Sequence, residues 1–403
     1  MQEQLKEVKI LVLSFYYEPD LSAGSFRSSA LVKSLLSRLG SEDEIEIITT
    51  LPNRYSSYSS EAAEFEKKGR VSIHRVRLPA HQNGMLDQSR SFLSFARYVS
   101  KRTKNQPYDL VYATSSRLMT AVLGCFVAKR SSICLYLDIR DIFVDTMKDV
   151  LSKKVVAACL PFFGILERWA IGGAQRVNLV SRGFQDYFET RYPSQTFDFY
   201  SNGIDSIFLE KKESYEPSSD REGKKVSILY AGNFGEGQGL HKIIPQLASL
   251  LSDRVSFRLL GDGGRKSKLE EKVASLECKN VTILGPVTRD ELLAEYQDAD
   301  VLFIHLNDHD AFKKVLPSKL FEYAATGKPI LAGVSGYASS FLEAEVVNAK
   351  VFRPCDAESG LEAFNSLALR HTHRQSFIEK YSRVNIMSEM TGSLLDLLQE
   401  DVM

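Results

Sequence analysis

The chain has 403 residues, of which 44% are hydrophobic and 25% charged, and its formal net charge is zero. This composition is that of an ordinary globular protein and excludes the disordered and fibrous classes. A chain of this length exceeds what one hydrophobic core usually supports, so we expect two domains. The opening residues MQEQLKEVKI contain no basic stretch followed by an apolar run, so we expect no export signal and a cytoplasmic location.

Charge and cysteine content narrow the range of partners. Residues 1–205 carry 27 Lys and Arg against 22 Asp and Glu, whereas the remainder carries 24 against 29. This imbalance is too mild for a nucleic-acid-binding protein, but it fits a first half that faces an anionic membrane surface or acceptor. The cysteines have no CxxC pairs and no His at zinc-ligand spacing, so we expect reduced thiols and no metal site.

In the first half, apolar runs alternate with amphipathic stretches. The run at 8–13 leads into a loop punctuated by Pro and Gly, and residues 26–39 then have helical spacing. Further strands are predicted at 44–50, 71–76, 109–112, 133–137 and 176–180. Alternation of this kind predicts a parallel sheet covered by helices.

A second series of strands follows in the other half. We predict them near 226–230 and at 255–260, 280–284, 300–304, 329–331 and 350–352. Between the two series, residues 210–225 have linker composition, so the boundary should fall within 202–225. The predicted fold is α/β, with Rossmann-like, doubly wound domains at 1–205 and 206–373 facing a central cleft. The helical segment 374–403 can pack on either domain, including by crossing back to the first.

Three glycine-containing segments each follow a predicted strand. The segment AGNFGEGQG at 231–239 precedes a helix, and its glycines would let a ligand approach backbone N–H groups, so we interpret it as a phosphate-contacting loop. A glycine-rich turn without a ligand explains it equally well. The candidate donor-binding residues of the three segments are Gly232, Asn233, Gly235, Gln238, Gly261, Gly263, Gly285 and Val287. No GxGxxG opens either half, which argues against a nicotinamide cofactor.

The segment LPSKLFE at 316–322 predicts an anion site at the start of a helix. Pro317 suits the first helical position, and the helix should run through Ala325 to Gly327. The free N–H groups there favour a diphosphate, while Glu322 lies one turn further on the same face and can accept two ribose hydroxyls. The alternative is a surface ion pair between Lys319 and Glu322. Leu316, Ser318, Lys319 and Glu322 are the donor-binding candidates.

Asp138, Arg140 and Asp141 follow a predicted strand of the first half. We interpret Asp138 and Asp141 as candidate catalytic carboxylates that orient a hydroxyl acceptor, with Arg140 binding the acceptor. Alternatively, Asp138 caps a helix and Arg140 is its ion-pair partner. The string Asp-His-Asp at 308–310 matches a metal-binding pattern, but we interpret it as a polar loop.

Two stretches combine aromatic, aliphatic and basic residues. VVAACLPFFGIL at 155–166 follows three lysines and is too short to span a bilayer, so an interfacial segment is one explanation. Residues 91–104 are a second candidate for membrane contact. Core packing explains both stretches nearly as well.

Together these segments resemble the retaining family 4 glycosyltransferases of GT-B fold, especially the subgroup of bacterial N-acetyl-L-fucosamine transferases of O-antigen and capsule synthesis. The resemblance covers nearly the whole chain. It is carried, in order, by YYEP at 16–19 with Gly24 and Arg27, DIRD at 138–141, NGID at 202–205, the Gly232 loop, GDG at 261–263, and 317–329.

The resemblance implies roles for individual residues. Gly24 would lie in a loop near the diphosphate and acceptor, Arg27 would bind the acceptor, and residues 202–205 would form the interdomain hinge. Glu322 would bind the donor ribose, and residues 285–287 would hold the base through their backbone. Many relatives have a Glu that contacts the transferred sugar where this chain has Lys314. Two basic residues common in the glycine loop are replaced by Asn233 and Gln238.

The resemblance also implies a reaction. A hexose, N-acetylated or 6-deoxy, would pass with retention from a UDP-sugar to a lipid-carrier-linked saccharide at the inner membrane face, without a metal or other cofactor. The alternative is an isomerase, because hydrolysing UDP-N-acetylglucosamine 2-epimerases share the GT-B architecture.

Overall fold

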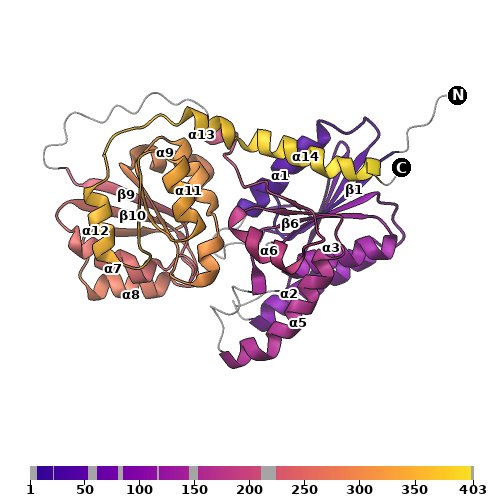
Figure 1. Cartoon of the computed structure of the whole chain (residues 1–403), viewed down its shortest axis with the longest axis horizontal. Helices are drawn as coiled ribbons and strands as arrows, with labels where there is room; N and C mark the ends of the chain where they lie inside the picture. Colours follow the sequence, from indigo (N-terminus) through magenta and orange to yellow (C-terminus); the bar gives the residue numbers. More distant parts are fainter. Residues whose placement is uncertain are drawn as a thin grey trace. The chain divides into compact units, whose positions relative to one another are not determined.

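The structure is a computed structural model that describes residues 7–20, 22–52, 61–79, 85–115, 118–144, 153–209 and 224–400 (Figure 1). The chain divides into two compact units, of which unit 1 comprises Met1–Asn202 with Val384–Met403 and unit 2 comprises Gly203–Arg383. The chain therefore passes from one unit to the other twice. Most of the predicted linker, residues 210–223, lies outside the described residues.

Unit 1 is built on an eight-stranded sheet of order β3-β4-β2-β1-β5-β6-β7-β8, parallel except for the pair β3 and β4. Its strands are β1 (Lys9–Ser14), β2 (Glu44–Thr50), β3 (Phe65–Lys68), β4 (Val71–Val76), β5 (Leu110–Ser115), β6 (Cys134–Ile139), β7 (Arg176–Leu179) and β8 (Phe197–Asp198). Six of these strands, β1, β2, β4, β5, β6 and β7, were predicted because they contain apolar runs. The edge strands β3 and β8 were not predicted, since neither carries such a run.

The helices of unit 1 are α1 (Ala23–Leu36), α2 (Met85–Arg102), α3 (Leu118–Ser131), α5 (Lys153–Ile171), α6 (Gln185–Arg191) and α14 (Arg383–Glu400). Ser22 caps α1 by accepting a hydrogen bond from the Ser25 N–H at 3.1 Å, so Gly24 lies in the first helical turn and not in a loop. α14 lies beside α1 (Figure 1), where Ser34 donates to the Met387 carbonyl at 3.1 Å. The end of the chain thus forms part of unit 1.

Unit 2 has a fully parallel six-stranded sheet of order β11-β10-β9-β12-β13-β14. Its strands are β9 (Val226–Asn233), β10 (Val255–Asp262), β11 (Val281–Leu284), β12 (Val301–His305), β13 (Ile330–Gly333) and β14 (Ala349–Phe352). This is the Rossmann order. The first three strands are added towards one edge of the sheet, and the strand order reverses between the first strand, β9, and the fourth, β12. The loops after β9 and β12 therefore lie where open parallel sheets bind ligands.

Both faces of this sheet are covered, by α7 (Leu240–Leu250), α8 (Lys266–Ser275), α9 (Arg289–Asp298), α10 (Ser318–Ala325), α11 (Tyr337–Glu345), α12 (Ala357–Asn365) and α13 (Gln375–Lys380). The sheet needs helices on both faces, because the side chains of its strand β9 alternate between two separate apolar clusters. Leu229 and Ala231 belong to one cluster, and Ile228 and Tyr230 to the other. A strand buried on both faces is apolar at consecutive positions, as residues 228–231 are here.

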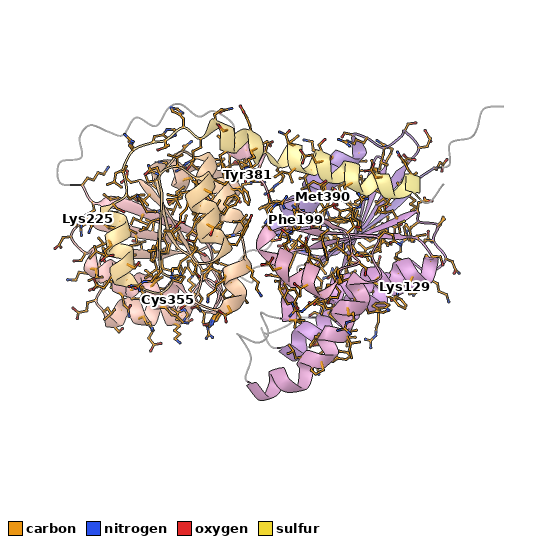
Figure 2. All side chains as sticks on the ribbon, viewed as in Figure 1. Lys129, Phe199, Lys225, Cys355, Tyr381 and Met390 are labelled. Carbon is orange, nitrogen blue, oxygen red and sulfur yellow. The ribbon has the colours of Figure 1, made fainter. Side chains whose placement is uncertain are left out.

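The helical segment predicted from residue 374 onward forms two helices, α13 and α14, within the described residues. Between α13 and α14, the Tyr381 carbonyl (Figure 2) accepts a hydrogen bond from the Ile204 N–H at 2.8 Å, and Ser382 forms a β-bridge with Ile204. These backbone groups are used for pairing with residue 204, so they cannot continue a helix.

Candidate functional site

The glycine loop of unit 2 joins β9 to α7 at the carboxyl edge of the sheet. Gly261, at the end of β10, has a φ of +143°, and a Cβ atom there would lie 1.8 Å from the Gly232 carbonyl oxygen. Gly263 has a φ of +157°, and its Cβ would lie 2.7 Å from Asn233 Oδ1. Only glycine tolerates both the backbone conformation and this close approach. The two loops therefore form one compact backbone surface.

Asn233 and Gln238, predicted to bind the donor, bind each other. Asn233 Nδ2 donates to Gln238 Oε1 at 2.9 Å, and the Gly235 N–H donates to the same oxygen at 3.3 Å. Glu236 also lies in the loop, where it pairs with Arg265 at 2.5 Å and lies 3.8 Å from Lys242. These contacts fix the shape of the loop and neutralise the cations closest to it.

Lys319 supplies the positive charge that the loop itself lacks. A Cβ atom on Gly232 would lie 2.6 Å from Lys319 Cε, so the lysine side chain extends over the Gly232 backbone. Among the residues that the structure describes, Lys319 has neither an ion-pair nor a hydrogen-bond partner. The predicted surface pair with Glu322 is not formed in the described structure. An uncommitted ammonium group over a glycine backbone is suited to an anion.

α10 presents its positive end at the same place. Pro317 is the N-cap residue rather than the first helical residue, and α10 begins at Ser318, so the N–H groups of Ser318 and Lys319 lack intrahelical acceptors, whereas the Leu320 N–H donates to the Pro317 carbonyl at 3.1 Å. Leu316 is 5% exposed and belongs to the apolar core, so it anchors the helix and does not face a ligand. At the other end, buried Arg374 donates to the Ala324 carbonyl at 3.1 Å and to the Lys328 carbonyl at 2.9 Å. Burial lowers the pKa of Arg374 to about 10, which leaves it charged at neutral pH.

Glu322 lies one turn into α10 and is 8% exposed. The Tyr296 hydroxyl donates to its Oε2 atom at 3.1 Å, within a buried region. Desolvation and the charge of Glu322 raise the pKa of Tyr296 well above its ordinary value, so the phenol remains a proton donor. In the described part of the chain, Oε1 has no partner. A carboxylate with a single hydrogen-bond donor can still accept hydrogen bonds from a ligand.

The predicted base-reading segment follows β11. Gly285 is exposed, and Val287 is partly buried against the same cluster as Leu320. Thr288 follows directly. It is the N-cap residue of α9 and forms a capping box with Glu291. The segment is thus held at one end by a strand and at the other by a capped helix.

His305 supports the glycine loop and was missed by sequence reasoning. Its Nδ1 donates to the Gln238 carbonyl at 2.7 Å, and its Nε2 accepts from the Cys355 N–H at 2.9 Å. These two partners require the neutral imidazole with its proton on Nδ1. Burial lowers its pKa to about 4. The sequence pattern that could have identified it is a histidine at the end of a buried strand, next to the point where the strand order of the sheet reverses.

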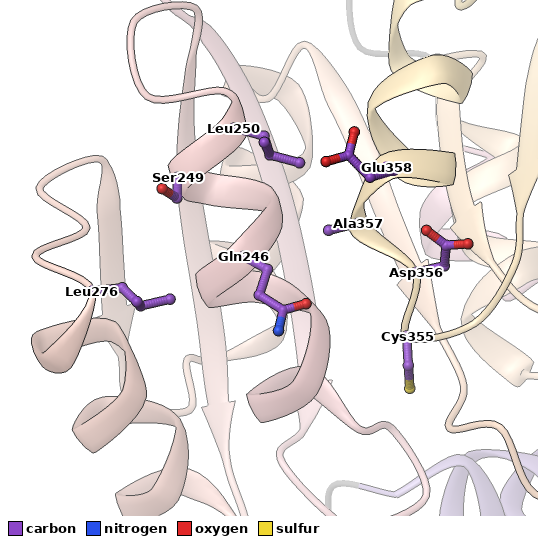
Figure 3. A pocket seen from close by; sticks show the side chains of 8 residues that line it. All are labelled: Gln246, Ser249, Leu250, Leu276, Cys355, Asp356, Ala357 and Glu358. Carbon is purple, nitrogen blue, oxygen red and sulfur yellow. The ribbon is translucent and has the colours of Figure 1, made fainter.

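Beyond Cys355, a pocket of about 540 Å³ lies between α7 and α12 (Figure 3). It is lined by Gln246, Ser249, Leu250, Leu276, Cys355, Asp356, Ala357 and Glu358. The residues of the glycine loop and of α10 are not among its lining. The pocket is therefore separate from the anion site.

In unit 1, Arg27 and Asp138 form a buried bidentate pair, with distances of 2.8 Å and 2.9 Å. Both side chains are fully buried. The remaining donors of Arg27 reach the carbonyls of residues 200 and 201 and the Met390 sulfur (Figure 2). The Asp138 oxygens also accept from Tyr112, Thr114 and Asn178. Neither side chain has an accessible or unused polar atom, so this geometry does not support the catalytic role predicted for Asp138 or the acceptor-binding role predicted for Arg27.

Arg140 and Asp141, just beyond β6, remain available. A Cβ atom on Gly24 would lie 2.2 Å from Arg140 Nη1, so the guanidinium lies against the first turn of α1. Its Nε atom is buried without a partner. The Asp141 side chain is exposed. Desolvation by the surrounding protein raises the pKa of Asp141 to about 6, although the positive charge of Arg140 lowers it in part. The exposed carboxylate is accessible to a substrate.

Both candidate membrane segments carry exposed apolar side chains. In α2, Phe92 and Phe95 are buried, whereas Leu93 and Tyr98 are 50% and 37% exposed. In α5, Phe162 and Ile165 are 59% and 66% exposed. The side chains of residues 153–159 lie outside the described part.

Of the described helices, none has the length and apolar character needed to cross a membrane. No cluster of metal-binding side chains occurs within the described ranges.

Comparison with solved structures identifies the architecture. Sucrose-phosphate synthase of Thermosynechococcus elongatus has a TM-score of 0.68 at 13% identity, covering 98% of this chain and 97% of that one. HepE of Anabaena, solved with UDP and glucose, has a TM-score of 0.67 at 16% identity, covering 97% and 100%. The chain has the GT-B fold. At these identities the likeness establishes the fold and not the reaction.

Two comparisons of sequence add to this. Residues 211–383 match the family Glycosyl transferases group 1. Over 346 residues the chain is 24% identical to the putative colanic acid biosynthesis glycosyl transferase WcaI of Escherichia coli, covering 79% of this chain and 82% of that protein. The matched family segment contains the glycine loop, Lys319 and Glu322. The proposed membership of the fucosamine-transferase subgroup gains no specific support.

Proposed function

We propose that this protein is a glycosyltransferase whose unit 2 binds a UDP-sugar. The observation that carries the proposal is Lys319, an ammonium group without a partner in the described structure, lying over Gly232 at the amino end of α10. Glu322, one turn further, keeps one carboxylate oxygen for a ligand. Positive charge and an acceptor at this spacing fit a diphosphate linked to a ribose.

The same arrangement supports the chemical step. When the glycosidic bond breaks, negative charge develops on the departing nucleoside diphosphate. Lys319 and the N–H groups of α10 are positioned to stabilise that charge more strongly than they stabilise the intact donor. We extend the proposal to retention of configuration and independence from metals or other cofactors, both of which rest on the family resemblance.

On the acceptor side, we propose that unit 1 contributes Arg140 and Asp141. Arg140 is suited to an anionic group such as a phosphate of a lipid carrier. Asp141 is suited to orient the attacking hydroxyl. The name of the WcaI relative and the solved structure of WaaG, a glycosyltransferase involved in lipopolysaccharide biosynthesis, support an acceptor in bacterial surface polysaccharide synthesis. The matched family favours transfer over the epimerase alternative.

We further propose that α5 contacts the cytoplasmic face of the membrane, where a lipid-linked acceptor would be presented. Phe162 and Ile165 are exposed on consecutive turns, and Arg168 follows on the same helix, also exposed. Apolar side chains beside a cation fit an anionic lipid surface.

A calorimetric titration with UDP tests the donor site. Replacing Glu322 by Ala should weaken UDP binding by about 1.5–3 kcal/mol for each charge-assisted hydrogen bond lost. A thermal-shift screen over nucleotide sugars would then name the donor, because a ligand that binds the native state raises the melting temperature. Unchanged UDP affinity in the Glu322→Ala protein would refute the assignment.

A further inference from the structure

The Glu322 carboxylate is held by a single neutral donor. Tyr296 donates to Oε2 at 3.1 Å, and no Lys or Arg among the described residues forms an ion pair with Glu322. A buried carboxylate with one donor and no counter-charge is under-satisfied, so its remaining oxygen is free to take donors from a ligand. Its orientation then depends on the one contact it has.

Tyr296 is itself held rigidly. Its ring packs edge-on against Tyr323, with centroids 5.3 Å apart, and stacks on Phe208 at 5.8 Å. The preceding residue of α9, Glu295, forms a bidentate pair with Arg258 of β10, with distances of 2.6 Å and 2.9 Å. The phenol oxygen is thereby fixed relative to the sheet.

Tyr323, next to Glu322 on α10, makes a different contact. Its hydroxyl accepts a hydrogen bond from the Ala231 N–H at 3.1 Å. Ala231 directly precedes Gly232, whose backbone lies under Lys319. The Tyr323 hydroxyl also interacts with the Tyr296 hydroxyl, so the carboxylate and the glycine loop are connected through both tyrosines.

We propose that Tyr296 is a positioning residue for nucleotide recognition: it holds Glu322 so that Oε1 receives the vicinal hydroxyls of the donor ribose. This rests on the proposed function, because it assumes that a nucleotide binds at Lys319 and Glu322. Tyr296 does not touch the ligand. It fixes the rotamer of the carboxylate and uses Oε2, which leaves one oxygen in a defined direction.

Removing one hydroxyl group tests the inference. Tyr296→Phe keeps the buried ring and its packing, and calorimetry would compare UDP with its 2′,3′-dideoxy analogue. We expect UDP binding to weaken about tenfold, as for one hydrogen bond to a charged group, and the dideoxy analogue to bind as it does to the unaltered protein. A purely structural role would weaken both ligands.

Tyr323→Phe is the matched control, because it removes a hydroxyl from the same aromatic cluster, together with the contact to the Ala231 N–H, but leaves the Tyr296 hydroxyl on Glu322. It should weaken both ligands by the same factor. In a Glu322→Ala background, Tyr296→Phe should have no further effect on UDP affinity, since the group it positions is gone. This second comparison remains decisive if Tyr296→Phe lowers the melting temperature.

Equal loss of both ligands in Tyr296→Phe, or loss of neither, would overturn the inference while leaving the proposed function intact. If the unaltered protein binds UDP no more tightly than the dideoxy analogue, or if Glu322→Ala leaves UDP affinity unchanged, the ribose assignment itself fails. The two failures are therefore distinguishable.

Discussion

Lys319→Met isolates the charge that the proposed diphosphate site depends on. Methionine keeps an unbranched stem that can lie over Gly232, where the lysine Cε now lies 2.6 Å from the position of an added Cβ. Lys319 has no partner among the described residues, so the substitution leaves no described carboxylate unpaired. The loss is therefore confined to the ligand, and a charged hydrogen bond contributes about 1.5–3 kcal/mol. UDP binding should weaken by roughly 10- to 150-fold.

Uridine provides the internal reference, because it lacks the diphosphate and should bind equally to both proteins. Lys268→Met makes the same change of charge at an exposed position of α8 and should leave UDP affinity within about twofold. Calorimetry at two salt concentrations would also show a smaller salt dependence for Lys319→Met. An unchanged affinity for UDP, or an equal loss for uridine and UDP, would refute the role given to Lys319.

Three further predictions concern stability and membrane contact. Gly261→Ala would place its Cβ 1.8 Å from a backbone oxygen, so it should destabilise unit 2 by ~3 kcal/mol or more, whereas Gly264→Ala, with no atom within 4 Å, should not change the melting temperature. Because the folded-state pKa of His305 is about 4, the unfolded state binds a proton first, and stability should fall as pH drops from 6.5 towards 4, by about 3 kcal/mol. Urea unfolding of His305→Gln should show a shallower pH slope, and an identical slope would contradict this. Replacing Phe162 and Ile165 by Ser should weaken co-sedimentation with anionic vesicles at least about tenfold, and unchanged co-sedimentation would remove the membrane proposal.

Much of the fold follows from the sequence because strands buried on both faces have a strong signal. β9 is apolar at consecutive positions, and the glycines that follow it mark the loop. Gly261 and Gly263 were predicted as a strand-end loop, and the structure explains why both positions require glycine. Local patterns of this kind need no knowledge of distant contacts.

Contacts between distant residues were not predictable. Arg27 and Asp138 are 111 positions apart, and each alone resembles an active-site residue, because a charge near a strand end is typical of such sites. Only the fold shows that they neutralise each other. The same holds for Tyr296, which lies 26 residues before Glu322 and appears in the sequence as an ordinary residue of an amphipathic helix. The break before α14 also depends on the β-bridge between Ser382 and Ile204.

The central claim is transfer of a sugar from a nucleotide donor, and an acceptor-dependence assay tests it most directly. The protein would be incubated with the UDP-sugar identified by thermal shift, with and without a lipid-linked saccharide, while UDP release and the sugar product are measured. We expect UDP release that depends on the acceptor, with formation of a glycosylated lipid. Conversion of the donor sugar to its epimer in the absence of any acceptor would contradict it.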